Sequence, residues 1–184
     1  MRLWPLTLIT ATACLLVACN TPRPPEGVKV VNNFNAARYT GVWYEIARLD
    51  NRFERGLINV TAEYGMRKDG AISVTNRGQD KASGRWKASN GVARFTGSPQ
   101  QAALKVSFFG PFYGGYNIIA LDEEYRHALV CGPNRDYLWL LSRQPTLPES
   151  VKQAWLKQAA AAGFPVQRLI WVDQADNLRR LNGR

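Results

Sequence analysis

The sequence predicts an all-β fold: an eight-stranded antiparallel up-and-down barrel with one C-terminal α-helix packed outside and a short ninth strand. From residue 41 to residue 143, short segments rich in β-branched and aromatic residues follow one another, each closed by a turn signal. No helical pattern separates them, and short links favour antiparallel neighbours. Eight such strands can close into a barrel without exposed edges, and a barrel of that size holds one small ligand.

The first four strands are predicted at residues 41–49, 59–67, 71–78 and 84–97. The fourth contains Asn90-Gly91, a dipeptide typical of tight turns. The sequence leaves two arrangements open at this point: a hairpin, or a bulge within one long strand.

The remaining four barrel strands are predicted at residues 103–109, 114–122, 126–132 and 137–143. Leu104, Val106 and Phe108 alternate with polar residues, so they share one face of their strand. Residues 114–122 are apolar on both faces. The sequence therefore leaves open whether the inward set is Tyr116, Ile118 and Ala120 or the opposite one.

The pattern changes to helical spacing at residues 147–164, where one face is formed by Val151, Trp155, Ala159 and Ala162. Pro148 suits the start of this helix and Gly163 its end. Residues 166–172 return to strand character and supply the ninth strand. The last ten residues, 175–184, are predicted to be a polar tail that frays.

The N-terminus has the parts of an export signal. Residues 1–18 combine a positive start, a short apolar stretch and a small final residue. Leu16 to Cys19 resembles the lipobox of bacterial lipoproteins, which implies that Cys19 is lipidated and becomes the mature N-terminus, and Asn20 resembles an outer-membrane sorting signal. An ordinary cleaved signal that happens to contain cysteines is the alternative. Residues 19–37, rich in proline at first, are then the lipidated N-terminus and a stiff tether.

The formal net charge of +10 favours anionic partners. Export makes nucleic acid an unsuitable partner, so we expect none. An anionic lipid head group or a charged envelope surface suits the charge better, although a merely solvated basic surface explains it equally well. A homodimer is a further arrangement that the sequence leaves open.

Catalytic and metal-binding motifs are missing from the sequence. Once Cys14 leaves with the signal and Cys19 carries lipid, Cys131 is the last cysteine, and its apolar setting favours a small buried hydrophobe over a reactive thiol. The single histidine, His127, has no metal-ligand spacing around it, and no nucleophile motif is present. We therefore expect no metal, no cofactor and no catalytic residue, so the protein is not expected to be an enzyme.

Three short motifs resemble those of a known family. A G-x-W motif lies on the first strand, an acidic turn with a tyrosine joins strands six and seven, and an arginine ends strand eight; the residues are Gly41, Trp43, Asp122, Tyr125 and Arg143. In order and spacing they resemble the signatures of lipocalins, although Leu121 stands where threonine is usual. Over residues 38–174 the chain resembles the bacterial lipoprotein lipocalins and their apolipoprotein D relatives.

This resemblance implies a barrel that is closed at one end. Trp43 is expected to fill the base from inside, with Arg143 lying across its ring as a cation–π contact, and Gly41 lets the chain pack tightly beside them. These are expected to be residues of the fold rather than of the ligand site. Residues 51–57 occupy the position of the loop that lids the open end in the family, and residues 110–116 form an aromatic loop at the mouth or an interface patch.

If Arg143 folds over the base from inside, strand alternation predicts that Tyr64, Val106, Phe108, Tyr137 and Trp139 bind the ligand, although plain core packing explains each of them equally well. Tyr116 and the loop pair Phe112 and Tyr113 are added to the predicted ligand-binding residues because they lie toward the open mouth. At the mouth, Arg52, Arg55 and Arg135 are expected to favour an anionic or zwitterionic head group.

The resemblance implies a lipid-binding protein that stores or transports fatty acids or lysophospholipid-like amphiphiles, for envelope maintenance or stress response. It would be anchored in the outer membrane through its N-terminal acyl chains and face the periplasm. The alternative is a structural or interaction lipoprotein with a filled barrel. Small residues alternating with aromatic ones on the inward faces favour the first function, and bulky residues on every inward face favour the second.

Overall fold

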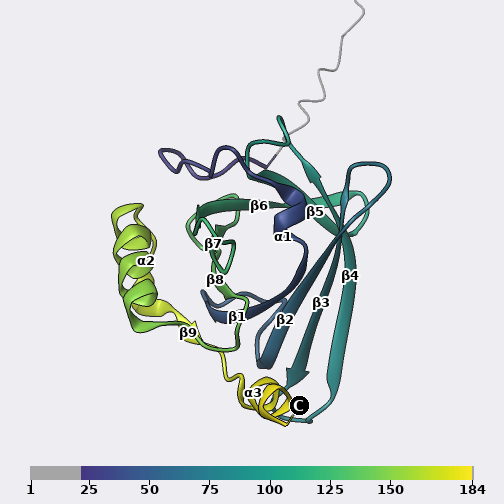
Figure 1. The fold of residues 1–184 in the computed structure, drawn as a ribbon, viewed down its shortest axis with the longest axis vertical. Coiled ribbons are helices and arrows are strands. Elements are labelled where there is room, and N and C mark those ends of the chain that lie inside the picture. The colour runs from purple at the N-terminus through teal and green to yellow at the C-terminus, as the bar shows by residue number, and fades with distance from the viewer. Residues whose placement is uncertain (1–21, 184) are drawn as a thin grey trace, which may run out of the picture.

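The computed structural model describes residues 22–183, and its centre is one antiparallel sheet closed into a barrel (Figure 1). The strand order is β2-β3-β4-β5-β6-β7-β8-β1-β9, and β2 also pairs with β1, which closes the ring. The predicted eight-stranded barrel with a ninth strand outside it is therefore confirmed. The strands are β1 (Gly41–Arg48), β2 (Leu57–Met66), β3 (Ile72–Asp80), β4 (Trp86–Phe95), β5 (Ala103–Phe109), β6 (Phe112–Leu121), β7 (His127–Cys131), β8 (Leu138–Ser142) and β9 (Ile170–Trp171).

The helices are α1 (Ala36–Tyr39), α2 (Glu149–Ala161), the 3₁₀ turn η1 (Val166–Arg168) and α3 (Ala175–Asn182). Within residues 22–183, no helix is both long and apolar enough to cross a membrane. The predictions that concern residues 1–18 and Cys19 lie outside the described residues.

The Asn90-Gly91 dipeptide makes neither of the two arrangements that the sequence left open. Strand β4 runs through it, and its pairing with β3 keeps one register from Ile72 opposite Ala93 to Gln79 opposite Trp86. A Cβ on Gly91 would lie 2.8 Å from both the Phe108 ring and the Ser107 carbonyl oxygen. Glycine is needed at this position because β5 passes too close to β4 to leave room for a side chain. The dipeptide therefore serves the packing of two strands and does not form a turn.

Two bulges decide which side chains enter the barrel. On β6 the register with β7 shifts between Ile118 and Ala120, so Ile118 packs inside while Ile119 and Ala120 both pack outside. Of the two sets that the sequence left open, Tyr116 and Ile118 of the first set pack inside, whereas its third member, Ala120, packs outside. On β1 the register with β8 shifts between Glu45 and Ala47, so Ile46 and Ala47 both pack outside. The following residue, Arg48, then lies on the same side as Glu45.

The molecule has two separate apolar cores. The inner one fills the closed end of the barrel and includes Trp43, Tyr64, Leu104, Ile118 and Leu141. The outer one joins the barrel wall to α2 and includes Ile46, Leu129, Leu140, Trp155 and Phe164. Figure 1 shows α2 against the outside of the barrel next to β7 and β8, as the sequence predicted. Gly163 follows the helix with φ +82°, as expected of a glycine at a helix end.

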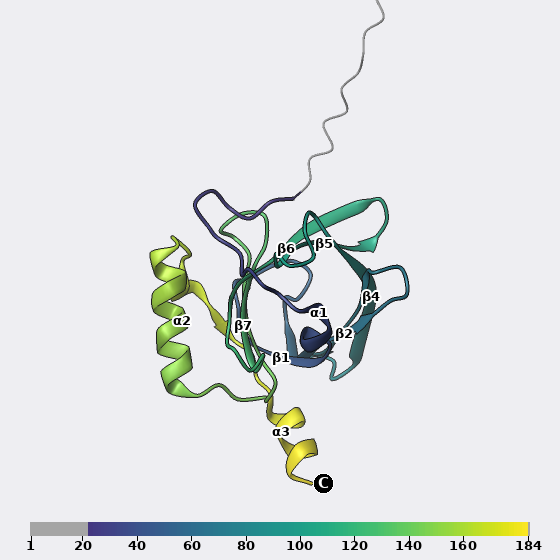
Figure 2. The same cartoon turned by 45° about the horizontal axis from the view of Figure 1, so that its top comes forward.

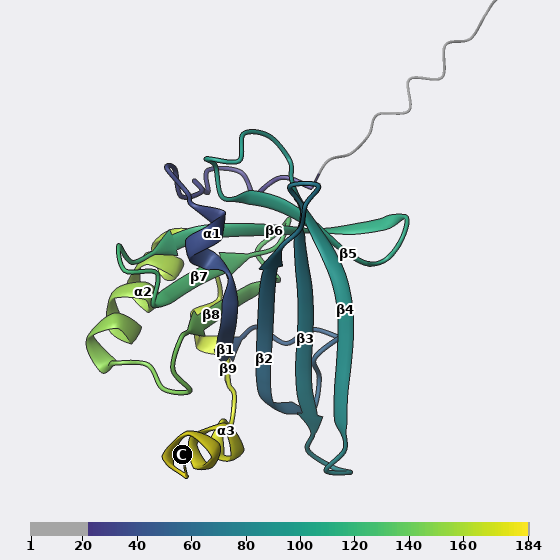
Figure 3. The same cartoon turned by 45° about the vertical axis from the view of Figure 1, so that its right-hand side comes forward.

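The C-terminal segment corrects one prediction. Residues 175–184 were expected to fray, but Ala175–Asn182 form α3, which lies at the lower ends of the long strands β2 and β3 (Figure 3). Asn177 is buried, and its side-chain amide donates to the Asn59 carbonyl oxygen at 3.2 Å and to Gln174 Oε1 at 2.6 Å. Arg180 also stacks on Trp86 at 5.0 Å. Polar contacts between α3 and β2 therefore hold the C-terminal segment against the barrel.

Candidate functional site

The barrel contains a cavity of about 660 Å³ that opens between the loops at one end. This volume lies in the usual range for small-molecule sites, roughly 300–1,000 Å³. Small side chains leave the space: among the lining residues are Ala62, Gly78, Ser89, Ala93 and Gly114. Aromatic and aliphatic side chains supply most of the remaining wall. The barrel is therefore not filled by its own side chains.

The far end of the cavity is closed by α1, which lies inside the ring of strands in the view down the barrel (Figure 2). Tyr39, at the end of α1, lines the cavity, and its ring packs 4.6 Å from the ring of Trp43, which is fully buried behind it. The Arg143 guanidinium lies 4.0 Å from the Trp43 ring on its other side. A Cβ on Gly41, which has φ +92°, would lie 3.3 Å from Arg143 Nη1. This is the closed base expected from the sequence motifs.

Asp122 and Tyr125 serve the same end of the barrel. Asp122 Oδ1 accepts hydrogen bonds from the backbone N–H groups of Arg126 and His127, each at 2.7 Å. Tyr125, with φ +57°, turns the chain, and its hydroxyl accepts from the Asn35 backbone N–H at 2.9 Å. These contacts join the β6–β7 turn to the start of α1, so both residues shape the fold and lie away from the cavity lining.

Three tyrosine hydroxyls meet at the deep end of the cavity. Tyr116 OH lies 2.8 Å from Tyr39 OH and 2.8 Å from Tyr64 OH, and all three side chains line the cavity. Burial raises the pKa of each of the three phenols, so all are neutral and keep their protons at neutral pH.

The open end is framed by exposed aromatic side chains. Phe53, Phe109 and Phe112 are 68%, 76% and 77% exposed, and Tyr113 is 45% exposed, yet all four border the cavity. They belong to the β1–β2 loop (residues 49–56) and to the β5–β6 hairpin. Exposed apolar side chains gathered around an opening mark a contact site for an apolar molecule.

A buried ionic cluster lies under the β1–β2 loop. Arg48 Nη1 is 2.7 Å from Glu45 Oε1, with both side chains almost fully buried. Arg48 Nη2 donates to the carbonyl oxygens of Glu54 and Leu57 at 2.7 and 3.1 Å. Desolvation and the neighbouring Glu54 carboxylate raise the pKa of Glu45 well above its usual range, against the opposing effect of Arg48. The cluster therefore ties β1 to the loop that covers the mouth.

Trp139 completes that attachment. Its indole N–H donates to Glu54 Oε2 at 2.9 Å, and Asn51 Nδ2 donates to the same oxygen at 2.5 Å. Asn51 Oδ1 in turn accepts from the backbone N–H groups of Phe53 and Glu54 at 3.1 Å. These hydrogen bonds form a latch that attaches the β1–β2 loop to β8, the strand paired with β1.

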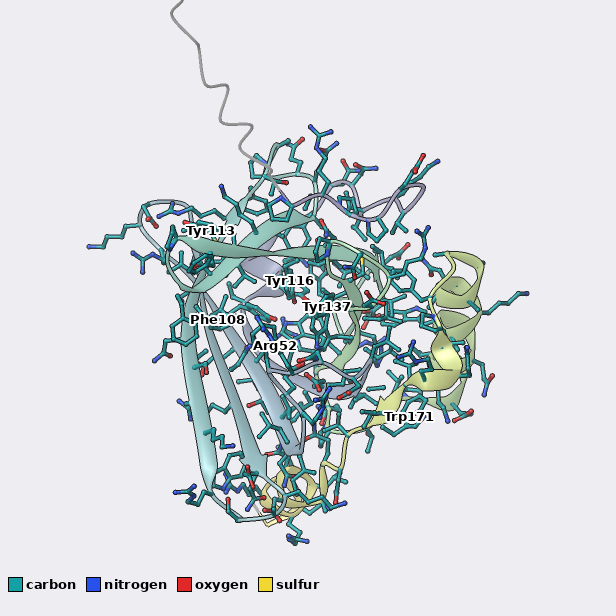
Figure 4. The ribbon with its side chains drawn as sticks, turned by 180° about the vertical axis from the view of Figure 1, so that it is seen from behind. Arg52, Phe108, Tyr113, Tyr116, Tyr137 and Trp171 are labelled. Carbon is teal, nitrogen blue, oxygen red and sulfur yellow. The ribbon has the colours of Figure 1, made fainter. Side chains whose placement is uncertain are left out.

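All eight predicted ligand-binding residues line this one cavity; they are Tyr64, Val106, Phe108, Phe112, Tyr113, Tyr116, Tyr137 and Trp139. Figure 4 shows Tyr116 closer to the centre of the barrel than Tyr113. Of the three arginines expected at the mouth, one borders the cavity. Arg52 borders the cavity, but Arg55 pairs with Asp50 outside it, and Arg135 donates to the backbone carbonyls of Ala162 and Glu26.

Sequence reasoning missed Tyr39, Glu45, Arg48 and Glu54. The spacing of Glu45 and Arg48 on a strand suggests opposite faces, because only a bulge brings them together. Cys131 was interpreted correctly: it is buried in the outer core, and burial raises the pKa of its thiol to about 12. Among residues 22–183, no group of three or more potential ligand side chains is placed to hold a metal ion.

Comparison with known proteins identifies a family and several relatives that resemble this chain. A family profile described as "Lipocalin-like domain" matches residues 34–174. The chain is 62% identical over 174 residues to "Outer membrane lipoprotein Blc" of Escherichia coli (strain K12), covering 95% of this chain and 98% of that protein. It is also 30% identical over 164 residues to apolipoprotein D of Mus musculus, covering 84% and 82% of the two chains.

Among solved structures, the cockroach allergen Per a 4 has the same fold, with a TM-score of 0.65 at 17% identity, covering 82% of this chain and 94% of that one. The E. coli similarity, which spans nearly the whole of both chains, gives this protein the same location: lipid-anchored in the outer membrane. Lipocalins are binding and transport proteins, and a ligand-sized cavity inside a closed-base barrel is the feature on which that activity depends. The chain belongs to the lipocalin family.

Proposed function

We propose that this protein binds one long-chain amphiphile, a fatty acid or a lysophospholipid, inside its barrel and stores or carries it for maintenance of the cell envelope. The observation that carries the proposal is the cavity of about 660 Å³ lined mostly by apolar side chains. Each methylene moved from water into such a site gains ~0.8 kcal/mol before the costs of ordering the chain are counted. A filled barrel, which the alternative function requires, does not agree with this cavity.

The head group of the ligand would lie at the mouth. Arg52 borders the opening, its guanidinium 4.8 Å from the Phe53 ring, and no hydrogen bond or ion pair holds it among the described residues. Lys87 lies opposite Gly78 on the inward face near the same end, where Asp80 pairs with it at 2.7 Å. Arg52 is therefore the cation best placed to meet a carboxylate or phosphate, while the acyl chain passes inward between Phe108 and Tyr116.

The anchor follows from the sequence motif. Cys19 would carry the acyl chains, since several chains hold a protein firmly where one holds it only marginally. The following proline-rich residues would tether the barrel on the periplasmic side of the outer membrane. A homodimer stays a prediction, which light scattering of the purified protein tests.

The test is a titration on the full-length chain carrying Cys19→Ala, which leaves the barrel residues unchanged. Palmitate, a lysophospholipid with the same acyl chain and the corresponding alcohol are compared by displacement of a fluorescent fatty acid. We expect saturable binding of all three, with the alcohol weakest. Arg52→Gln should reduce the preference for the two anionic or zwitterionic ligands, and Arg55→Gln, on the same loop but paired outside the mouth, should leave it unchanged. No saturable binding of any of the three ligands contradicts the proposal.

A further inference from the structure

We propose that the hydroxyl groups of Tyr39, Tyr64 and Tyr116 form a polar subsite at the deep end of the cavity, which binds an uncharged oxygen group at the far end of the ligand's acyl chain. The inference rests on the proposed function, because it assumes that an acyl chain enters the barrel. It adds a ligand class, chains hydroxylated or otherwise oxygenated at their distal end.

The three tyrosines have one more hydroxyl proton than their mutual hydrogen bonds use. Each of the three phenols has one hydroxyl proton. The two hydrogen bonds of 2.8 Å, from Tyr116 to Tyr39 and from Tyr116 to Tyr64, require two of these three protons. Whichever way these bonds run, one O–H has no acceptor among the described residues. Buried tyrosine hydroxyls are usually hydrogen-bonded, because a buried donor without an acceptor loses its hydration and gains no hydrogen bond in return. The unused donor and the remaining lone pairs border the cavity, so a ligand oxygen can satisfy them.

The position of the three hydroxyls fixes which part of a ligand they meet. Tyr39 packs on Trp43 at the closed base, and Tyr64 lies opposite Gly41 in the β1–β2 pairing, so both lie at the closed end. Tyr116 and Phe112 are on the same strand, with Phe112 at the mouth. Four residues of extended strand separate them by about 13 Å. A ligand whose head group stays at the mouth would therefore meet the tyrosines with the distal part of its chain.

The surroundings favour a neutral group over an anion. The cation beneath the base, Arg143, lies behind Trp43, and its donors go to the backbone carbonyl oxygens of Arg38, Thr40, Val42 and Tyr125 at 2.8–3.2 Å. None of these bonds points a positive charge into the cavity. A carboxylate at the tyrosines would lose its hydration without a cation to pair with, whereas a hydroxyl both accepts and donates there.

The experiment compares palmitate, ω-hydroxypalmitate and α-hydroxypalmitate on the full-length Cys19→Ala protein. In an apolar cavity, an unpartnered ω-hydroxyl weakens binding about tenfold or more relative to the methyl group. With the three tyrosines present, we expect ω-hydroxypalmitate to bind at least as tightly as palmitate. The α-hydroxyl lies at the mouth in water and should change the affinity little.

The matched variant replaces Tyr39, Tyr64 and Tyr116 together by phenylalanine, since any tyrosine that remained would still carry one unused proton. In this variant we expect the ratio of the two affinities to change, so that ω-hydroxypalmitate binds about tenfold more weakly than palmitate, whatever the affinity for palmitate itself. Asn76 Oδ1, a buried oxygen without a hydrogen-bond partner on another residue of the lining, is retained in the variant, so a lost preference for the ω-hydroxyl is due to the tyrosines. Tyr44→Phe, on the outer face of β1, is the control and should bind both acids as the parent protein does.

A spectroscopic readout covers the case in which the triple variant does not fold. Hydrogen bonding of a phenol shifts its near-ultraviolet absorption, so ω-hydroxypalmitate should produce a tyrosine difference spectrum in the parent protein that palmitate does not. Identical spectra, together with an ω-hydroxyl that weakens binding about tenfold in the parent protein, would show that the tyrosines only shape the floor. Failure of both acids to bind overturns the proposed function itself, and with it this subsite.

Discussion

Arg143 lies 4.0 Å above the ring of Trp43 and at the same time donates hydrogen bonds to the carbonyl oxygens of Arg38, Thr40, Val42 and Tyr125. One side chain thus joins the start of β1, the end of α1 and the β6–β7 turn around a fully buried indole. The contact with the ring contributes ~0.5–2 kcal/mol, depending on how far it is desolvated. The hydrogen bonds hold the closed base, without which the barrel would be a pore.

Removing Trp43 should therefore be costly, and the cost should depend on Arg143. Trp43→Ala is expected to lower the free energy of unfolding by ~3–5 kcal/mol. Because the two residues touch, Arg143→Ala and Trp43→Ala should be non-additive in a double-mutant cycle of urea denaturation. Trp86→Ala, which removes a 42% exposed indole that stacks on Arg180, is the control and should cost much less. Additive effects at Trp43 and Arg143 would show that the arginine does not cap the indole.

The latch of the β1–β2 loop should control how quickly a ligand leaves. Glu54→Ala removes the acceptor that holds both Trp139 Nε1 and Asn51 Nδ2. A hydrogen bond to a charged acceptor contributes ~1.5–3 kcal/mol, so losing the latch should speed fatty-acid dissociation by at least about tenfold in a stopped-flow displacement experiment. Glu124→Ala removes a 68% exposed carboxylate at the opposite end and serves as the control. An unchanged dissociation rate in Glu54→Ala would mean that the loop does not gate the mouth.

The buried carboxyl of Glu45 should make stability depend on pH. Burial and Glu54 raise its pKa in the folded protein, so the folded state keeps a proton that the unfolded state releases above its ordinary value of ~4.3. Stability due to this group is complete below that value and declines as pH rises toward the raised folded pKa.

Glu45→Gln has no titratable group at this position, so its stability should not fall with rising pH for this reason. Thermal melts of both proteins are compared from about pH 5 to about pH 8. The melting temperature of the variant should rise relative to that of the parent protein as pH increases. Parallel curves would mean that Glu45 has no raised pKa in the folded state. Asp69 is an exposed carboxylate whose pKa is lowered by Arg94 and Arg67, so it is ionised in both the folded and the unfolded state over this pH range. Asp69→Asn is therefore the control, and its curve should run parallel to that of the parent protein.

The anchor prediction concerns a residue outside the described part of the chain. Cys19→Ser should release the protein from membranes into the periplasmic fraction, because serine cannot take the thioether-linked acyl chains. Cys14→Ser changes a cysteine five residues earlier and should leave the protein membrane-bound. Fractionation after a high-salt wash distinguishes the two outcomes, and a Cys19→Ser protein that stays in the membrane fraction would require another anchor.

The barrel could be predicted from the sequence because each strand carries its own signal. Alternation on β5 and the turn residues between segments fixed the strand number, and the apolar face of α2 placed the helix outside. Five of the lining side chains, those of Tyr64, Val106, Phe108, Tyr137 and Trp139, followed from alternation once Arg143 was assumed to fold over the base.

The remaining features depend on contacts that no local pattern records. A bulge on β1 turns Arg48 back toward Glu45, and a bulge on β6 sends Ala120 outward. Helix α3 is held by hydrogen bonds to Asn59, a residue more than a hundred positions earlier in the chain. The three tyrosines come from α1, β2 and β6, and only the closed barrel brings their hydroxyls together.

The most direct test of this account is native mass spectrometry of the full-length Cys19→Ala protein after incubation with palmitate, because it counts ligands per chain. We predict one bound fatty acid per chain. Ser89→Trp, which puts an indole on the inward face of β4, should abolish that peak, and Asn90→Trp, the next residue on the outward face, should keep it. Loss of binding in neither variant, or equal loss in both folded variants, would contradict a ligand held inside the barrel.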